Sequence, residues 1–402
     1  MPVAATVESS DLDRRGMAVL SASHMFTDVS QGALPALLPF FVQQRGWSYA
    51  AVAALVLAHT VASSVMQPLF GIASDRYGLS ALIPVGVLLS GLGIAVSGVA
   101  PSYEWTFAAM VVSGSGVAAF HPEGSRYANY VSGSRRGRGM SLFAVGGNAG
   151  FATGPLLATP LVLAFGLPGT VWLAVPTTLM ALVAARELPR LRTFKPSAPK
   201  RASADASGEN DVGAFVRLGG VITLRSFFYF GFSTFLPLYF IQELGTSTAE
   251  TNIALSVLLV SGAVGTLIGG PLADRYGRRT VLLTTYGVTT PLMLAFLASG
   301  QIVATGLLAF IGAAIIATFS LTVLMGQEYM PDRIGLASGV TLGLAIGLGG
   351  VGASLFGVVA DLYGLRVTME VLAALPLLAA ALALTLPRHT VRERRDLAAR
   401  AA

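Results

Sequence analysis

Charged residues and cysteine are scarce in this chain of 402 residues. Only 11% of the residues are Asp, Glu, Lys or Arg, and none is cysteine. A soluble domain carries about 25% charged residues, so this sequence cannot build an ordinary water-facing surface. The lack of cysteine excludes disulfides, thiolate metal sites and cysteine nucleophiles. Walker motifs, nucleophile elbows and metal-type spacings of histidine are also missing, so we expect no enzyme, no cofactor and no metal site.

Long apolar stretches make up most of the chain, and 54% of its residues are hydrophobic. A helix needs about 20 apolar residues to cross roughly 30 Å of hydrocarbon. The stretches are continuous, which favours helices over the alternating strands of a membrane barrel. We therefore predict an all-α membrane protein with twelve transmembrane helices, at 16–43, 49–73, 81–100, 104–129, 139–165, 168–188, 214–242, 249–272, 280–299, 303–328, 334–362 and 366–386.

The sequence repeats itself at an offset of about half its length. Asp-Arg-Tyr-Gly occurs at 75–78 and again at 274–277, which is 199 positions later. LPFFVQQ at 38–44 matches LPLYFIQ at 236–242, 198 positions later. Between the halves, the polar segment Pro189–Asp211 is rich in Ala, Ser, Pro and charge and cannot form a core. We predict a six-helix bundle at 1–188, a cytoplasmic linker at 189–213 and a second six-helix bundle at 214–402, ending in a short basic tail.

The basic residues indicate the orientation in the membrane. If both termini are cytoplasmic, 22 of the 26 lysine and arginine residues lie on the cytoplasmic side, while the outer loops hold only Arg45 and Arg366. This asymmetry is what the positive-inside rule requires. The net charge of +6 is therefore a topology signal. We expect membrane lipid as a partner, and no nucleic acid.

The duplicated loop motif resembles a motif of the major facilitator superfamily. Gly-xxx-Asp-Arg-x-Gly follows the second predicted helix and recurs after the eighth, and the resemblance covers essentially the whole chain. The second copy is close to the family pattern, whereas the first has Leu79 and Ser80 where basic residues are usual. The resemblance implies two pseudo-symmetric six-helix bundles in a bacterial inner membrane, and a monomer.

Further phrases are similar to particular branches of that superfamily. Gly150, Gly154 and Pro155 in the fifth predicted helix resemble the Gly-Pro signature of drug/proton antiporters, although Ala158 and Thr159 replace its usual glycine pair. HMFTDVSQGALPALLPFF, AFHPEGSRYAN, FAVGGNAGFATGP and GQEYMPDRIGLASGVTLGLAIGLGG resemble the fosmidomycin-resistance group of efflux proteins. This likeness implies antibiotic efflux, with fosmidomycin as one candidate substrate.

Physical chemistry suggests a conformational latch at the loop motif. A carboxylate at the end of a helix can meet the N-terminus of a neighbouring helix or an arginine, and such a contact can exist in one conformation only. The glycines are expected to let backbones pack closely. The alternative is that the motif only builds a tight turn. The residues concerned are Gly71, Asp75, Arg76, Gly270, Asp274, Arg275 and Arg278.

The first predicted helix carries His24, Asp28 and Gln31 on one face, at i, i+4 and i+7. Asp28 lies about halfway along the helix, near the centre of the bilayer. A charged side chain there is costly unless it is paired, which makes it a candidate for function by default. We predict that Asp28 and His24 bind and release the coupling proton. A stripe of structural hydrogen bonds between helices is the alternative.

The fourth predicted helix carries Glu123, Arg126 and Tyr127 along one stripe, with His121 beside it. Glu123 and Arg126, at i and i+3, can pair with each other, and a closed pair can be purely structural. Arg126 can also extend toward the inner membrane surface. In the functional interpretation, Glu123 contributes to proton coupling and the other three residues contact substrate.

The seventh predicted helix carries Arg225 and, one turn later, Tyr229. At the 198 offset Arg225 corresponds to Thr27, which is next to Asp28. The two halves are therefore expected to present opposite charges, Asp28 and Arg225, at matching depth toward a shared cavity. Arginine suits forked recognition of carboxylate or phosphonate oxygens. An ion pair between Asp28 and Arg225 is the alternative, and the two are compatible. Gln31 is a further polar candidate. Asn148 and His59 are weaker ones, because a lone asparagine or histidine in a helix bundle more often holds helices together.

Together these features predict a secondary transporter that works by alternating access. We favour proton-coupled efflux of a small anionic drug or metabolite. An uptake symporter for an organic anion would use the same residues, because sequence does not reveal direction. A membrane sensor that does not transport is a third reading, and no large soluble output domain supports it.

Overall fold

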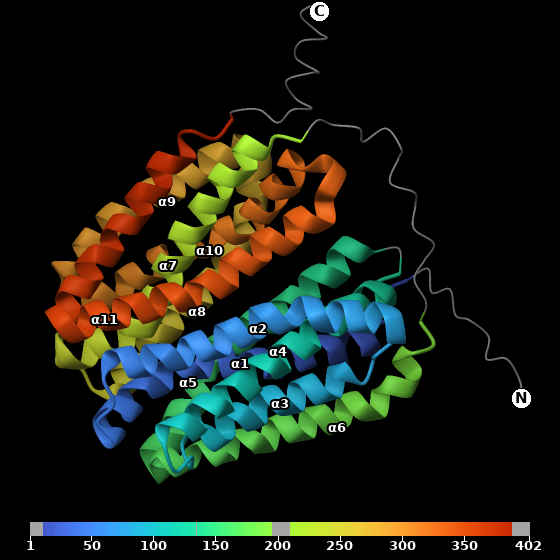
Figure 1. Ribbon diagram of the computed structural model, residues 1–402, viewed down its shortest axis with the longest axis horizontal. Coiled ribbons are helices and arrows are strands. Elements are labelled where there is room, and N and C mark those ends of the chain that lie inside the picture. Colours follow the sequence, from blue (N-terminus) through green and yellow to red (C-terminus); the bar gives the residue numbers. More distant parts are fainter. Residues whose placement is uncertain (1–10, 134, 195–209, 388–402) are drawn as a thin grey trace, which may run out of the picture. The chain divides into compact units, whose positions relative to one another are not determined.

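The computed structural model describes residues 11–133, 135–194 and 210–387, and contains no strand within these ranges (Figure 1). The expected all-α class is therefore confirmed for the part described. The helices are α1 (Arg14–Arg45), α2 (Tyr49–Tyr77), α3 (Leu82–Ser97), α4 (Tyr103–Val131), α5 (Arg136–Phe165), η1 (Leu167–Leu173), α6 (Ala174–Leu191), α7 (Val212–Gln242), α8 (Thr248–Tyr276), α9 (Arg278–Leu297), α10 (Gln301–Tyr329), η2 (Pro331–Arg333) and α11 (Ile334–Ala383).

Nine helices in the described ranges are long and apolar enough to cross a membrane. Helix α3 is apolar but has only 16 residues. Helix α4 is not among the nine, and the charged Glu123 and Arg126 contribute to its lower hydropathy. Helix α11 contains the last two predicted spans, joined at Gly364, whose φ of 85° is a left-handed conformation open to glycine. The predicted number of twelve spans stays a prediction.

Local sequence signals explain where the helices begin and end. Asp13 and Ser48 cap α1 and α2 by accepting hydrogen bonds from backbone N–H groups of the first turn. Such caps satisfy donors that the helix itself leaves unpaired. At the other ends, Gly46 and Gly78 adopt left-handed conformations with φ of 67° and 64°.

Two compact units divide the chain. The first consists of Met1–Pro199 with Ser247–Ser256, and the second of Lys200–Thr246 with Val257–Ala402. Within the first unit, α1 packs on α5, α2 packs on α4, and α3 packs on both α4 and α6 (Figure 1). The core between these helices includes Met17, Phe120 and Phe143, all buried. The site described below lies in this unit, between α1 and α4.

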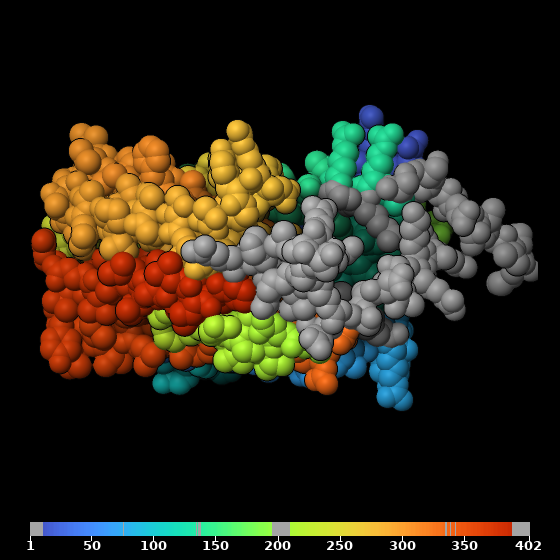
Figure 2. Space-filling model, turned by 90° about the horizontal axis from the view of Figure 1, so that it is seen from above, coloured from blue at the N-terminus to red at the C-terminus, as the bar shows by residue number. Residues whose placement is uncertain are grey.

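Within the second unit, α7 packs on α11, and α9 packs on α10 and α11. Helix α8 approaches α10 so closely that a Cβ on Gly265 would collide with the carbonyl of Ala313. In the space-filling view, the start of α7 and the start of α9 border the end of α11 (Figure 2). There Arg217 and Arg279 donate to the carbonyl oxygens of Thr385 and Leu384, just beyond the end of α11, at 2.8 and 2.6 Å. Basic groups stabilise this end of a helix.

The predicted linker is helical at both ends. Helix α6 continues to Leu191 and α7 begins at Val212, so both extend into the interval 189–213; residues 195–209 lie outside the described ranges. The extension of α6 is held by ion pairs, because Arg190 lies 2.7 Å from both Asp13 and Glu187. Glu187 is also 2.7 Å from Arg15, so the end of α6 is tied to the start of α1.

Candidate functional site

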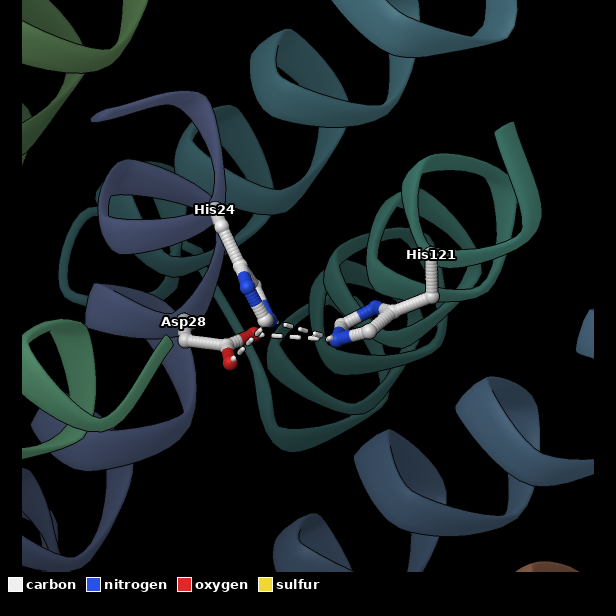
Figure 3. A group of neighbouring side chains, drawn as sticks. All are labelled: His24, Asp28 and His121. Carbon is white, nitrogen blue, oxygen red and sulfur yellow. Dashed lines mark hydrogen bonds and ion pairs between the residues drawn. The ribbon is translucent and has the colours of Figure 1, made fainter. Parts of the chain in front are cut away.

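Helices α1 and α4 bring two histidines and a carboxylate together (Figure 3). His24 and Asp28 lie one turn apart on α1, and His121 faces them from α4. The Nε2 atom of His24 lies 3.2 Å from Oδ2 of Asp28 and 3.2 Å from Nε2 of His121. Nε2 of His121 lies 3.6 Å from Oδ1 of Asp28. The sequence predicted the α1 pair, and the structure adds His121, which we had assigned to substrate binding.

Hydrogen bonds to backbone carbonyls determine which nitrogen of each ring carries a proton. Nδ1 of His24 is 2.8 Å from the carbonyl oxygen of Phe143, and Nδ1 of His121 is 2.8 Å from that of Val117. A carbonyl oxygen only accepts, so both Nδ1 atoms must donate. In the neutral rings, each Nε2 atom then carries a lone pair and can only accept a hydrogen bond. These lone pairs and the Asp28 carboxylate converge on one point.

With both rings neutral, this arrangement contains acceptors but no donor. Three acceptors at hydrogen-bonding distance repel one another unless a proton or another cation lies among them. One extra proton, on either Nε2 or on the carboxyl group, supplies a donor that the neighbouring acceptors can share. The cluster of His24, Asp28 and His121 is thus a binding place for a positive charge.

The surroundings hold the carboxylate in place and keep water away. Gln31 donates from Nε2 to Oδ1 of Asp28 at 2.7 Å. The Asp28 side chain is 4% exposed, and the imidazole of His24 stacks on Phe143 at 4.2 Å between ring centroids. The His121 side chain is 23% exposed, so it is the more accessible of the two histidines. The predicted polar face of α1 is therefore a single buried network.

Glycines of α5 allow this network to form. A Cβ added to Gly147 would lie 2.5 Å from Nε2 of His24 and 2.9 Å from Oδ2 of Asp28. A Cβ on Gly150 would collide with the carbonyl of Met25. A Cβ on Gly154 would lie only 2.4 Å from the backbone nitrogen of Ala33 on α1. Gly150 thus brings α5 against α1 beside Asp28, and Gly154, which precedes Pro155, does so further along at Gly32 and Ala33. Sequence inspection missed Gly147.

Glu123 forms a separate buried pair on α4. Its carboxylate lies 2.9 Å from Nη1 of Arg126 and accepts a hydrogen bond from the hydroxyl of Ser74. Glu123 is only 1% exposed. The closed pair is the structural alternative that the sequence left open. It ties α4 to the end of α2, where the loop motif begins.

In the second unit, α7 holds Arg225 almost fully buried, at 2% exposure. Within the described part of the chain, its Nε and Nη1 atoms have no hydrogen-bond partner. Its guanidinium lies over the ring of Phe319 from α10, with Cζ 4.9 Å from the ring centroid. An unpaired buried cation is expensive, so this position calls for an anionic group. The sequence predicted Arg225 but not Phe319.

The remaining substrate candidates lie on the same helices. Tyr127 is half-buried and packs edge-on against Tyr130 at 5.5 Å between ring centroids. Asn148 is half-buried on α5. Tyr229 is half-buried on α7 and packs against Phe230. His59 is buried on α2, and its Nε2 atom has no hydrogen-bond partner among the residues described.

The loop motif is open to solvent in the second unit. Asp274 and Arg275 are exposed, and Asp274 makes no ion pair or hydrogen bond within the described ranges. Arg278 pairs instead with Glu328 at the end of α10. A Cβ on Gly270 would meet nothing within 4 Å.

The first copy of the motif is described in part. A Cβ on Gly71 would approach only Pro122, at 3.9 Å. The close backbone packing expected at Gly71 and Gly270 is therefore not present in this structure. Arg76 is exposed and lies over the ring of Tyr77. The side chain of Asp75 lies outside what the structure describes.

A helical membrane protein with a buried charge-binding cluster in one unit and a buried arginine in the other has the features of a membrane transporter. A family model of the Major Facilitator Superfamily matches residues 20–354 and 218–401. The chain belongs to the Major Facilitator Superfamily, and it is a transporter, not an enzyme.

Two curated relatives cover nearly the whole chain. An uncharacterized MFS-type transporter, YfnC, of Bacillus subtilis is 32% identical over 391 residues, which is 94% of this chain and 96% of that protein. The fosmidomycin resistance protein of Escherichia coli is 30% identical over 386 residues, covering 94% and 95%. The predicted superfamily and the resemblance to the fosmidomycin-resistance group are thus confirmed.

Solved structures agree on the fold. A bacterial homolog of the human lysosomal transporter Spinster superposes with a TM-score of 0.78 at 15% identity, covering 94% of this chain and 97% of that one. The nucleoside transporter NupG superposes with a TM-score of 0.72 at 15% identity, covering 92% and 99%. These similarities concern the fold alone.

Proposed function

We propose that this transporter exports a small anionic compound in exchange for protons, by alternating access of its two six-helix bundles. The similarity to the fosmidomycin resistance protein supports export of an antibiotic, and fosmidomycin, a phosphonate, is a candidate substrate. We further propose a monomer in the bacterial inner membrane with both termini in the cytoplasm. The alternation of access is a general property of folds built from such repeats.

The observation that carries the proposal is the convergence of three acceptor groups in one buried cluster. His24, Asp28 and His121 need one positive charge among three converging acceptors, as argued from the distances above. A group that binds a proton in one conformation and can release it in another is what coupling requires. Glu123 supports this role less, because Arg126 and Ser74 already neutralise and satisfy it.

Arg225 supports an anionic substrate. Its unpartnered nitrogens would gain charged hydrogen bonds from a phosphonate or carboxylate, each worth roughly 1.5–3 kcal/mol. We place Tyr229 beside it in the same role. In the first unit, Arg126, Gln31, His121, Tyr127 and Asn148 are the further candidates for substrate contact.

An uptake symporter for an organic anion is the second candidate, because the same residues would serve it. The direction of the proton gradient separates the two. In an exchanger, an acidic interior drives accumulation of substrate in proteoliposomes. In a symporter, an acidic exterior does so.

The test of coupling is Asp28→Asn in proteoliposomes. The amide has nearly the size of the carboxylic acid but cannot titrate, so uphill transport driven by a pH gradient should stop while downhill exchange of substrate partly survives. Asp332→Asn, at an exposed aspartate of η2, is the matched control and should transport normally. If Asp28→Asn still concentrates substrate on a pH gradient, Asp28 is not the coupling group. If the unaltered chain transports substrate at the same rate with and without a pH gradient, proton coupling itself is overturned.

A further inference from the structure

We propose that His24, Asp28 and His121 bind a divalent transition-metal ion, and that Zn²⁺ fits the site best. Each residue offers one ligand atom, and the three ligand atoms lie within 4.8 Å of one another. Two imidazoles and one carboxylate are the ligands that Zn²⁺ takes in many proteins. This inference stands on the geometry of the first unit and does not depend on proton coupling.

The spacing of the ligand atoms matches a metal ion. Zn²⁺ bonds to nitrogen and oxygen at about 2.0–2.2 Å with tetrahedral angles, which separates two ligand atoms by about 3.3 Å. The two Nε2 atoms lie 3.2 Å apart. Nε2 of His24 lies 3.2 Å from Oδ2 of Asp28, and Nε2 of His121 lies 3.6 Å from Oδ1, the other oxygen of the same carboxylate. The carboxylate therefore faces each imidazole with a different oxygen, and it can hold a small ion through both oxygens or turn to present one of them.

The hydrogen bonds behind the ligands are those that a metal site needs. A histidine that binds a metal through one ring nitrogen donates its other N–H to a carbonyl or carboxylate, which fixes the ring. His24 does so to Phe143 and His121 does so to Val117, each at 2.8 Å. Gln31 in turn holds Oδ1 of Asp28. Both imidazoles thus already present Nε2 in the tautomer that binds metal.

The same site leaves room for one more ligand. Three protein ligands leave the fourth position of a tetrahedral ion to water or to a small anion. A divalent ion with one carboxylate also keeps a net positive charge, which favours an anionic fourth ligand. The partly exposed His121 marks the side from which that ligand can enter.

Sequence inspection predicted no metal site because the spacing is not that of a known motif. His24 and Asp28 are close in sequence, but His121 is 93 residues beyond Asp28. The pair meets its third partner only because α1 and α4 pack together.

A binding measurement on the whole purified chain tests the inference. The protein is prepared without a polyhistidine tag, stripped with a chelator, and titrated with Zn²⁺ by calorimetry and with Co²⁺ by visible absorption. We expect one ion per chain, and a tetrahedral Co²⁺ spectrum. His121→Gln and Asp28→Asn should each weaken binding at least as much as the roughly 10–100-fold loss known for outer-shell partners.

His389→Gln and Asp332→Asn are the controls. His389 lies near the C-terminus, outside the described ranges, and Asp332 is an exposed aspartate of η2. Both controls should bind like the unaltered chain. Equal weakening by the controls, or no stoichiometric binding by the unaltered chain, would overturn the inference.

A second measurement needs no variant and so is safe against misfolding. X-ray absorption at the zinc edge of the unaltered chain should detect two imidazole ligands and oxygen neighbours. An all-oxygen shell, or one imidazole, would contradict the site. Neither measurement involves transport. A negative result for metal binding therefore does not contradict the proposed exchange of protons and substrate, and a negative result for proton coupling does not contradict the metal site.

Discussion

Replacing Arg225 with methionine should make the transporter more stable and worse at binding anions. The guanidinium is 2% exposed, and two of its nitrogens lack hydrogen-bond partners among the described residues. Methionine keeps much of the length and removes the buried charge. Exchanging buried charges for apolar side chains of similar volume is often neutral or stabilising by about 1–4 kcal/mol. Loss of the contact with Phe319, worth about 0.5–2 kcal/mol, offsets part of this gain.

Anion binding should change in the opposite direction. Charged hydrogen bonds of about 1.5–3 kcal/mol would be lost, which is about one to two decades in Kd. Arg225→Lys keeps the positive charge but loses the forked guanidinium geometry, so its affinity for the anion should lie between those of the unaltered chain and Arg225→Met. A neutral diester of the same phosphonate should lose much less affinity, because it offers no charge to the guanidinium.

Thermal unfolding in detergent and equilibrium binding together check this prediction. Arg217→Met is the control on the same helix; Arg217 donates to the carbonyl of Thr385, so its loss should lower stability slightly and leave ligand affinity alone. A marked drop in stability for Arg225→Met, with equal losses for charged and neutral ligands, would refute the reasoning. Arg225 would then be half of a structural ion pair.

Two further variants test the latch and the packing of α5. Asp274→Asn should shift the conformational equilibrium by about 0.3–2 kcal/mol toward the state described above, because Asp274 has no ion pair or hydrogen bond among the described residues in that state; spectroscopic distances across the end of the molecule that carries the loop motif should change, and unchanged distances would contradict this. Gly150→Ala should reduce stability by about 1–3 kcal/mol, since its Cβ meets the carbonyl of Met25. Gly287→Ala, with open space around it, should be neutral or up to about 1 kcal/mol stabilising by thermal unfolding.

The fold class could be predicted from the sequence because membrane helices are recognisable from local composition alone. Each apolar run satisfies its own backbone hydrogen bonds, so its length and composition alone predict it. Prediction was weaker where a span is short or polar. Helix α3 has 16 residues, and α4 carries charges that only its packing explains. The break at Gly364 was predictable as a boundary between two spans, but the sharp kink without an intervening loop was not.

The candidate site was predictable along a helix and not across helices. The spacing of His24, Asp28 and Gln31 placed them on one face because the period of a helix is fixed. Nothing local in the sequence places His121 against that face. The same limit applies to Phe319, whose contact with Arg225 depends on how α7 packs against α10.

The duplication accounts for both of these contacts. Helix α4 begins at Tyr103 and α10 at Gln301, which is an offset of 198, and at that offset His121 corresponds to Phe319. The first helices of the halves match at the same offset, so Thr27 corresponds to Arg225. The contact residues on the fourth helices therefore occupy matching positions, and those on the first helices, Asp28 and Arg225, lie one position apart at this offset. One half holds a carboxylate against imidazole, and the other holds a guanidinium against an aromatic ring.

These two contacts differ in what they still require. Asp28 finds His24, His121 and Gln31 within its own unit and needs only a positive charge as small as a proton. Arg225 has a ring beneath it but no anion within the described part of its own unit. An ion pair between the halves would satisfy the arginine, yet the carboxylate does not need it. The asymmetry favours a ligand that brings its own negative charge to Arg225, while the first unit takes up the positive charge.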